Sequence, residues 1–580
     1  MLLGVTAVCI LLGHTAVNGQ KSFAIVEDGT LTEYKDTLAF ANAIQDQLSK
    51  WRGDRYLLAN IDSVVTTADH TTAHLYKGVP YQYGNVSISE QDQQLIGALG
   101  LSRYQWKRQD VSTAQLSSYM DKIIRYLEDR GYPFASAGLT DVEVVDGTIS
   151  AALAVDRGPY VEFDSLIIRG DLNVKRSYLR QYLVVQRGQP YSRTKYENIS
   201  KRLRELPFLK LNAEPKLRFY DGKAELYLDA DNARSSRFDF LIGVLPSTSA
   251  GQRQLTITGE FTAELYNRLG QGEYLYASFE RVRPEVQELE LKVRYPYIAG
   301  LPVGAAGGLS IYRRSSDFLE VESLLGADFQ LSGNTRLFAG WNLKSSRLID
   351  IDTAAILSAG TLPANLDVVY QGGNIGLQIS DLDYRWNPTK GYQLTIDSKI
   401  GQKRILKNNV ITSLQEGTTD FASSYDSLAL QTLQLSGGVD LAYYIPLHKI
   451  ITVQTRLRGK FIYNSDQVFA NEYYRIGGNR LLRGFDEQSV LSESYALLTA
   501  EMRLLLDRNS YLTLPFIDFG YTRVQSQDQL IWDQVLGIGL GINFATPAGI
   551  FNVSFASGSR LDNQLNFNDT KVHFGYVSLF

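Results

Sequence analysis

Two histidines stand four residues apart and could hold a metal ion if they lay on one helix. His70 and His74 have this spacing, and Asp69 supplies a carboxylate beside them. An i, i+4 pair places both imidazoles on one helix face, as in zinc-binding helices. The segment around them is rich in threonine and is a poor helix, and the chain has no second histidine cluster to complete a site. The sequence therefore predicts no metal site and no cofactor.

Patterns that carry catalysis or nucleotide binding are absent or better explained by strands. Gly537, Gly539 and Gly541 are spaced like a glycine-rich loop, but their flanks are strand-like and no helix pattern follows them. The sequence contains no Gly-x-Ser-x-Gly motif, and its one cysteine is Cys9. These observations indicate that the protein is not an enzyme.

An arginine and an aspartate in two separate motifs are the strongest candidate pair. A guanidinium shielded from bulk water needs a carboxylate, and its planar fork can fix a loop in one orientation. We expect Arg483 and Asp518 to form this pair, the alternative being that the arginine lies in an exposed turn. Glycine after the arginine permits a sharp turn, and the aromatic residue after it can pack against a wall. The motifs are Arg483, Gly484 and Phe485, within residues 476–485, and Phe516, Asp518 and Gly520.

The composition indicates a modular, β-rich chain. At 580 residues it exceeds the size of one ordinary domain. The 58 basic and 62 acidic residues leave a net charge of −4, which gives no indication of nucleic-acid binding. The 35 tyrosines, 25 phenylalanines and 48 glycines favour many twisted strands and tight turns.

The N-terminus resembles a secretory signal. An apolar run spans residues 2–12 and is followed by small residues, so we predict a signal peptide over residues 1–19 with cleavage after Gly19. Removal of this segment takes Cys9 with it, which excludes disulfides from the mature chain. No run of 18 apolar residues follows Gly19. If the protein enters a membrane, it does so as a closed barrel.

Within residues 232–580, the region predicted to form one domain, residues 256–580 alternate between apolar and polar positions, segment after segment. Residues 255–265 and 288–295 show the alternation clearly. A transmembrane barrel and a soluble β-sandwich share this pattern with the faces reversed. Segments here are longer than the 8–12 residues typical of sandwiches, which favours an antiparallel barrel of about 16 strands. The non-alternating stretches 349–365 and 407–425 are candidate external loops.

The region before the barrel contains internal repeats. Residues 159–231 follow the order strand, helix, helix, strand, strand, and residues 83–158 follow the same order. Both copies contain an Asp-Gly pair typical of a hairpin turn. A fainter copy fills residues 20–82, with residues 38–48 helical and 57–65 extended.

The last ten residues, 571–580, have the character of a final barrel strand. Phe574, Tyr576 and the terminal Phe580 lie on one face of this segment. Aromatic residues gather at the two membrane interfaces of barrels. The segment therefore predicts a strand that ends at a membrane surface.

Together these parts resemble the outer-membrane assembly-factor family of Gram-negative bacteria, in which periplasmic POTRA repeats precede a 16-stranded barrel. The stretch 476–485 is similar to the family's lumen-loop motif, and residues 516–520 are similar to its barrel-wall partner motif. The layout is closest to that of TamA within the BamA/TamA type. The resemblance also implies a C-terminal assembly signal, to which His573, Gly575 and Phe580 correspond; Ser578 departs from the expected aromatic residue.

The resemblance implies a function in protein insertion or translocation at the outer membrane. POTRA-like domains in the periplasm are expected to receive client polypeptides by strand addition. The barrel is expected to act through a weak seam between residues 238–245 and 571–580. Gly243 and Pro246 either reduce pairing at this seam or mark an ordinary strand end. Implied partners are unfolded outer-membrane or secreted clients, the lipid bilayer, and periplasmic or inner-membrane accessory proteins. Two alternatives remain: a two-partner secretion transporter, and a passive diffusion porin with periplasmic appendages.

Overall fold

The computed structural model forms two compact units. One contains residues up to 165 with 186–197 and 217–226, and the other contains residues 166–185, 198–216 and 227 onward. The predicted signal peptide lies outside the described residues. The structure describes residues 22–579 except 28, 68, 101–108, 250–251, 284–285, 299, 315–316, 385–386, 417–418, 480, 508, 527–528, 547–548 and 561–564.

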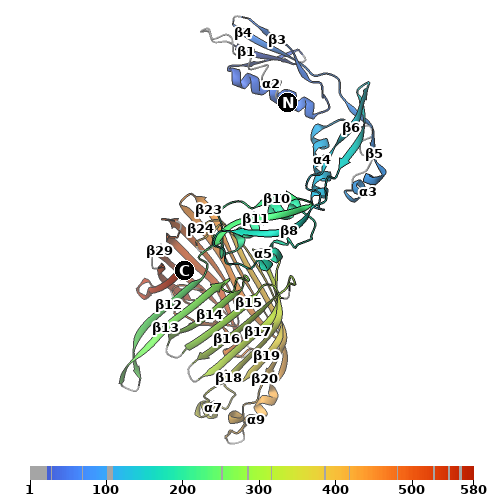
Figure 1. The fold of residues 1–580 in the computed structure, drawn as a ribbon. Coiled ribbons are helices and arrows are strands. Elements are labelled where there is room, and N and C mark those ends of the chain that lie inside the picture. The colour runs from blue at the N-terminus through green and yellow to red at the C-terminus, as the bar shows by residue number, and fades with distance from the viewer. Residues whose placement is uncertain are drawn as a thin grey trace. The chain divides into compact units, whose positions relative to one another are not determined.

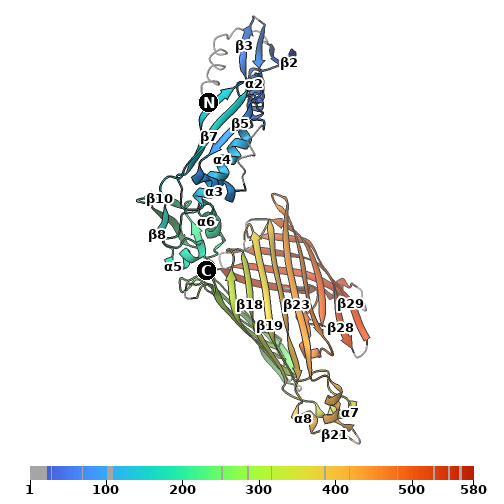
Figure 2. The same cartoon turned by 90° about the vertical axis from the view of Figure 1, so that its right-hand side faces the viewer.

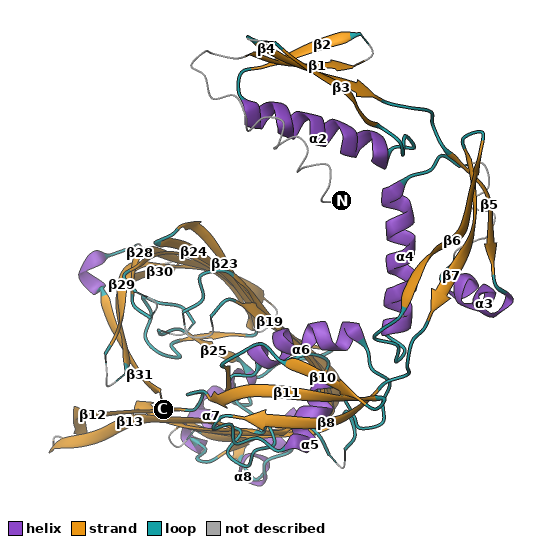
Figure 3. Cartoon of the chain, turned by 45° about the horizontal axis from the view of Figure 1, so that its top comes forward, coloured by secondary structure: helices purple, strands orange, loops and turns teal. Residues whose placement is uncertain are grey.

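The N-terminal repeat is a four-stranded sheet with one helix packed on it (Figure 3). The strand order is β2-β1-β4-β3, with β1 and β4 parallel. Helix α2 begins after Asp36, whose carboxylate accepts from the Ala39 amide at 2.7 Å, and it buries Phe40 and Trp51. The elements are β1 (Ser22–Glu27), β2 (Thr30–Tyr34), α2 (Thr37–Gly53), β3 (Asn60–Thr66) and β4 (His70–Tyr76).

The expected helix over residues 38–48 lies within α2, and β3 covers most of the stretch 57–65 expected to be extended, but this repeat has one helix where each of the next two has two. A second strand, β2, takes the place of the first helix, because the chain turns back on β1 at Gly29 with φ of +81°. Glycine adopts this backbone conformation without steric cost. The parallel pairing of the first and last strands is nevertheless the same as in the next repeat.

The second repeat has the predicted order of strand, two helices and hairpin. Ser89 and Ser112 cap the two helices through hydrogen bonds to Asp92 and Gln115 amides. The sheet order is β5-β7-β6, and the β6–β7 turn has positive φ at both Asp146 and Gly147. The elements are β5 (Gln82–Ile88), α3 (Glu90–Ala98), α4 (Thr113–Glu128), β6 (Ser136–Val145) and β7 (Thr148–Asp156).

The third repeat has the same succession of elements. Its main sheet order is β10-β11-β8, and Asp221-Gly222 forms the hairpin turn with positive φ at both residues. Strand β10 begins at Lys216, directly after Pro215. The elements are β8 (Glu162–Arg169), α5 (Arg176–Leu183), α6 (Arg193–Glu205), β9 (Leu209–Leu211), β10 (Lys216–Tyr220) and β11 (Lys223–Asn232).

Sixteen antiparallel strands then close into a barrel, which confirms the predicted fold (Figure 1). The strands follow one another around the wall in chain order: β12 (Arg237–Ser249), β13 (Gln252–Tyr266), β14 (Tyr274–Arg283), β15 (Val286–Tyr295), β16 (Gly304–Arg314), β17 (Phe318–Gln330), β18 (Thr335–Leu348), β19 (Val368–Leu382), β20 (Gly391–Ile405), β23 (Gln431–His448), β24 (Ile451–Asn464), β27 (Ser494–Leu505), β28 (Tyr511–Ser526), β29 (Gln529–Ala545), β30 (Ile550–Arg560) and β31 (Lys571–Leu579).

Strand β27 shows that the polar face of the wall points into the barrel. Its residues alternate between buried and exposed along nearly the whole strand. Glu501 and Arg503 are buried, whereas Leu498 and Met502 are exposed. A soluble sandwich would bury the apolar face instead, so the alternation decides in favour of a lipid-facing barrel.

Two of the predicted external loops fold together at one end of the barrel (Figure 2). Residues 349–366 carry α7 (Thr353–Ala359), and residues 407–430 carry α8 (Asn409–Thr412), α9 (Phe421–Ser424) and the pair β21 (Gln415–Glu416) and β22 (Thr419–Asp420). We refer to these two segments as the cap. Ile356, Ile411, Phe421 and Tyr425 form its apolar core. The cap follows the seventh and ninth strands, so antiparallel order places it opposite the end where β12 begins.

The barrel closes through a short seam. Strand β31 pairs with β12 only at Arg237 and Phe238 among the described residues, whereas β12 pairs with β13 along its full length. Gly243 and Pro246 lie in the part of β12 beyond these two pairs. Backbone pairing therefore holds this joint more weakly than its neighbours.

The repeats predict a separable folded fragment. Residues 83–230 should be soluble and show mixed α/β circular dichroism, because each repeat has its own core. Ile123→Ala should lower the free energy of unfolding of this fragment by about 2–5 kcal/mol, because Ile123 is fully buried. Val142→Ala is the matched control and should change it by less than about 0.5 kcal/mol, because Val142 is exposed. A disordered fragment alongside a folded full-length protein would show that the domain boundaries are wrong.

Candidate functional site

A long loop enters the barrel from the cap end. It joins β24 to β27 and comprises residues 465–493, which we call the lumen loop. It contains η3 (Ala470–Glu472) and the antiparallel pair β25 (Tyr474–Ile476) and β26 (Val490–Ser492). Figure 3 shows β25 inside the ring of barrel strands. Between β25 and β26 the chain bends at Gly477 and Gly478, which both have positive φ.

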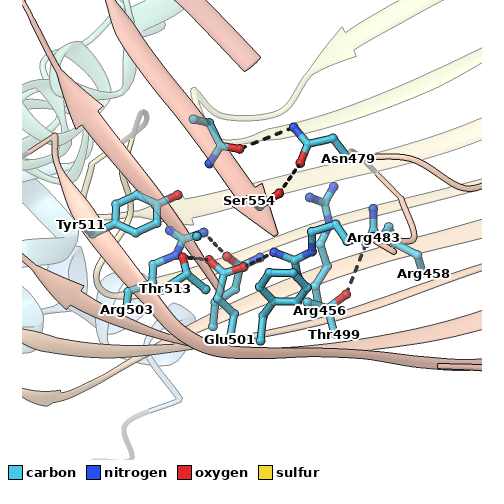
Figure 4. A pocket seen from close by; sticks show the side chains of 14 residues that line it. Arg456, Arg458, Asn479, Arg483, Thr499, Glu501, Arg503, Tyr511, Thr513 and Ser554 are labelled. Carbon is cyan, nitrogen blue, oxygen red and sulfur yellow. Dashed lines mark hydrogen bonds and ion pairs between the residues drawn. The ribbon is translucent and has the colours of Figure 1, made fainter. Parts of the chain in front are cut away.

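Arg483, at the tip of the lumen loop, is held by two carboxylates of the wall, those of Asp518 and Glu501. Figure 4 shows Arg483 beside Glu501. Its Nε and Nη2 donate to Asp518 at 2.8 and 2.9 Å, which is the bidentate geometry expected for an arginine fork. Its Nη1 donates to Glu501 at 2.8 Å, and its amide donates to Asp518 at 3.1 Å. Thr499 donates to the second Asp518 oxygen at 2.8 Å. Both oxygens of Asp518 are thus satisfied.

The pair lies in a crowded, largely buried part of the lumen. Asp518 is 1% exposed and Glu501 is 7% exposed. Arg503 donates to Glu501 at 2.8 Å, and Arg458 donates to the carbonyl of Leu481 in the lumen loop at 2.8 Å. A cavity of about 400 Å³ lies beside these groups (Figure 4). Removing one partner from a buried network of this kind leaves an uncompensated charge, which is the costly case.

Three glycines allow the loop tip to touch the wall. Gly537 and Gly558 face each other on β29 and β30. A Cβ on Gly537 would collide with the carbonyl of Arg483, and a Cβ on Gly558 would lie 2.5 Å from the carbonyl of Gly484. Gly484 itself has φ of +88°, and a Cβ there would lie 2.7 Å from Gly558. Any side chain at these positions would displace the tip.

Two aromatic residues flank the ion pair. The guanidinium of Arg483 lies 3.5 Å from the ring centroid of Phe516, which is fully buried. Phe485 packs in an apolar cluster with Leu497 and Val535 on the wall. Gly520 contributes differently, because a Cβ there would collide with the backbone of β27 rather than with the loop.

The last strand also contacts the loop tip. Nε2 of His573 accepts a hydrogen bond from the Gly484 amide at 3.2 Å, which requires a neutral ring with its proton on Nδ1. Lys571 pairs with Asp486 at 3.1 Å. Gly575 faces Asn479 of the loop. Phe580, the third residue of the predicted assembly signal, lies outside the described residues.

Glu501 and the two wall glycines were missed by the sequence interpretation. Glu501 and Arg503 lie on the inward face of β27, so period-two alternation could have predicted that both side chains point into the lumen. Gly537 was interpreted as a strand glycine, and the structure adds the loop backbone that it accommodates. Contact between these strands and a loop of the same chain has no local sequence signal.

Other candidate chemistry is not assembled by the fold. His70 and His74 lie on strand β4 rather than on a helix. Within the described ranges, no group of three or more His, Cys, Asp or Glu side chains could hold a metal ion. No helix of the described part of the chain is long and apolar enough to cross a membrane.

Comparison with known proteins identifies the family. The profile of the Omp85 superfamily domain matches residues 267–576, more than half of the chain, and the protein belongs to this superfamily. The structure is similar to CdiB from Escherichia coli, with a TM-score of 0.55 and 14% identity over 94% of this chain and 97% of that one. For CdiB from Acinetobacter baumannii the TM-score is 0.52, with 14% identity over 86% and 90%. For BamA from Haemophilus ducreyi lacking POTRA domains 1–3, the TM-score is 0.44, with 15% identity over 86% and 100%. A search of curated proteins found no match.

Adding one methyl group at Gly537 tests the close contact between the loop tip and the barrel wall. Gly537→Ala should displace the tip, because the new Cβ would collide with the Arg483 carbonyl. Overpacking of this kind costs about 1–3 kcal/mol, which corresponds to roughly 5- to 150-fold faster hydrogen exchange of the amides of residues 482–486. Gly373→Ala on β19 is the matched control, because no atom lies within 4 Å of its Cβ position. Equal exchange in both variants would contradict the contact.

Proposed function

We propose that this protein inserts or translocates client polypeptides at the bacterial outer membrane. Membership of the Omp85 superfamily supports an assembly or transport role, and the lipid-facing barrel supports residence in the outer membrane. The observation that carries the proposal is the tip of the lumen loop, where Arg483 is bound by Asp518 and Glu501 next to the last strand. No catalytic step is part of this function.

The short seam supports a route for clients. Among the residues that the structure describes, two residue pairs join β12 to β31, so opening this joint breaks few backbone hydrogen bonds. A client strand could add to the edge of β12 that faces β31, because a sheet edge accepts an added strand without requiring one sequence. The seam thereby gives the barrel a place where clients enter the membrane or pass across it.

The repeats supply further edges for clients. We propose POTRA-like domains over residues 20–82, 83–158 and 159–231, and a barrel over residues 232–580. Strand β6 is an edge strand ten residues long, and it exposes Val142, Val144 and Val145. An exposed, apolar edge of this kind is suited to hold extended polypeptide by strand addition. We place the repeats in the periplasm, where accessory proteins could also bind them.

Two alternative functions, a two-partner secretion transporter and a passive porin, predict different experimental results. A two-partner secretion transporter would export a dedicated partner, and the CdiB structures are the nearer of the comparisons reported above in TM-score. Three sheets precede the barrel, which we consider more typical of an assembly factor than of a two-repeat transporter. A passive porin would show large, steady conductance in bilayers that is unaffected by removal of the repeats.

Depletion followed by a survey of the outer-membrane and secreted proteomes separates these functions. An assembly factor should lower the abundance of several outer-membrane proteins at once. Loss of one secreted protein alone would favour the two-partner transporter. Unchanged proteomes together with reduced permeability to small solutes would favour the porin.

The lumen pair predicts the behaviour of a mutant set. Arg483→Ala and Asp518→Ala should each impair client assembly, because breaking a buried pair costs on the order of 3–5 kcal/mol and releases the loop. The double variant should be little worse than either single one, since both remove the same interaction. Arg483→Lys should not restore activity, because lysine lacks the planar fork. Client abundance in the outer membrane, measured after depletion of the wild-type protein, is the readout.

Arg456→Ala is the matched control for this set. Arg456 also pairs bidentately with an aspartate, Asp440, but it joins two neighbouring strands rather than loop and wall. Its loss should leave assembly close to the wild-type level. Additive defects in the Arg483/Asp518 double variant, or full activity of Arg483→Ala, would contradict the pairing.

A further inference from the structure

The lumen loop is anchored a second time, at its root. Phe469 is buried in the apolar core of the cap, beside Ile356 and Phe421. Asn471 is fully buried, and its amide group donates to Ser346 on β18 at 2.7 Å and to the carbonyl of Leu366 at 2.9 Å. The loop is thus fixed to the cap before it descends into the barrel.

A buried ion pair lies at this root. Lys403, on β20, is 1% exposed and contacts Glu472 of the loop, which is 4% exposed. The ammonium group also donates to the carbonyl of Gln467 at 2.7 Å and lies 4.4 Å from the ring centroid of Phe469. Glu472 in turn accepts from the Phe469 amide at 3.0 Å. An ammonium has three protons, and here it has three partners, all from one six-residue stretch of the loop.

The chain between root and tip touches the wall again. Arg475 lies 3.8 Å from the ring centroid of Tyr312 on β16 and 3.6 Å from a carboxylate oxygen of Glu320 on β17. On the far side of the tip, Gln488 donates to Glu288 on β15 at 3.3 Å. The lumen loop therefore contacts β15, β16, β17, β18 and β20 with its root and flanks, and β27 to β31 with its tip. Beside the root, Tyr473 and Tyr474 also donate to backbone carbonyls of Gln525 on β28 and Phe461 on β24. It crosses the lumen between two walls of the barrel.

We propose that Lys403 and Glu472 form a latch that holds the lumen loop across the barrel, and that Glu472 is a positioning residue for Arg483. Eleven positions separate Glu472 from Arg483, and this short chain is tethered at Arg475. Release of the root frees one end of the crossing segment, and the tip then loses its fixed approach to Asp518. Opening of the cap is thereby coupled to release of the loop tip beside the seam.

This inference deepens the proposed function, because it names how the same site is regulated. Its structural part concerns the loop alone and is measured without clients. Hydrogen exchange of the full-length protein in lipid nanodiscs reports the loop tip, where the amides of Arg483 and Gly484 donate to Asp518 and His573.

The variants are Lys403→Met, Glu472→Gln and the double variant Lys403→Met/Glu472→Met. Each single variant leaves one charge buried without its partner, so amides of residues 481–486 should exchange at least roughly tenfold faster than in the wild type. The double variant removes both charges and keeps similar volume, so exchange should return to near the wild-type rate. Heat-modifiable migration in electrophoresis shows that the barrel itself has folded.

Lys407→Met and Asp426→Asn are matched controls in the same cap. This pair is exposed, at 40% and 68%, so its loss should leave exchange at the tip unchanged. Wild-type exchange at residues 481–486 in both single variants, or faster exchange confined to residues 467–472, would overturn the latch. If the single variants do not fold, Ser346→Ala decides, because it removes only the hydrogen bond to Asn471 and should also speed exchange at the tip.

Client assembly in the same variants separates the two proposals. Faster exchange at the loop tip together with normal client assembly would support the latch but contradict the role of the lumen loop in the proposed function. An unaltered tip would contradict the latch whatever the effect on assembly.

Discussion

The barrel wall contains two buried carboxylates on neighbouring strands, and one of their cations comes from a loop. Asp518 and Glu501 lie on β28 and β27, and Arg483 is 35 and 18 residues away from them along the chain. Arg503 neutralises Glu501 from the wall, but the fork on Asp518 is supplied by the loop. Two like charges in a poorly solvated lumen are unfavourable without such cations. Wall and loop therefore stabilise each other.

Glycines in the barrel wall also allow the contact between the loop tip and the wall. Glycines at 537 and 558 let the loop backbone reach the strands, and Gly484 takes the positive φ that the tip requires. His573 and Lys571 connect the tip to β31, the strand that pairs with β12 at two positions within the described part of the chain. The loop thus braces from inside the strand that backbone pairing holds least firmly. We therefore expect displacement of the loop tip to weaken the pairing of β31 with β12 before it affects other strands.

Much of the fold followed from local patterns in the sequence. Period-two alternation together with the length of the segments predicted the barrel, Asp-Gly pairs predicted the repeat hairpins, and the motif residues Arg483 and Asp518 predicted an ion pair. The helix expected over residues 38–48 of the first repeat is present, but the hairpin at Gly29 was not predicted, because the pairing of β1 with β2 is not a local property of the sequence. The cap helices were not predicted, since residues 349–365 and 407–425 show little alternation and owe their order to a shared apolar core.

The partners that complete the site were beyond local inference for a physical reason. Lys403 and Glu472 are 69 residues apart, and Asn471 and Ser346 are 125 residues apart. Such contacts arise only when the strand order of a closed barrel and the path of the loop are both known. The local sequence around a buried lysine or a strand glycine does not identify the residue that it contacts.

Solid-state NMR of the protein in bilayers measures the central interaction directly. With ¹⁵N in arginine side chains and ¹³C in aspartate carboxyls, the Arg483 guanidinium and the Asp518 carboxyl should show a strong dipolar contact, which Asp518→Asn shifts and Arg483→Lys removes. The guanidinium protons should exchange slowly with water, because the side chain is 13% exposed. An Arg483 guanidinium that shows no dipolar contact with Asp518 and exchanges its protons rapidly with water would contradict the claim that this ion pair holds the lumen loop against the wall.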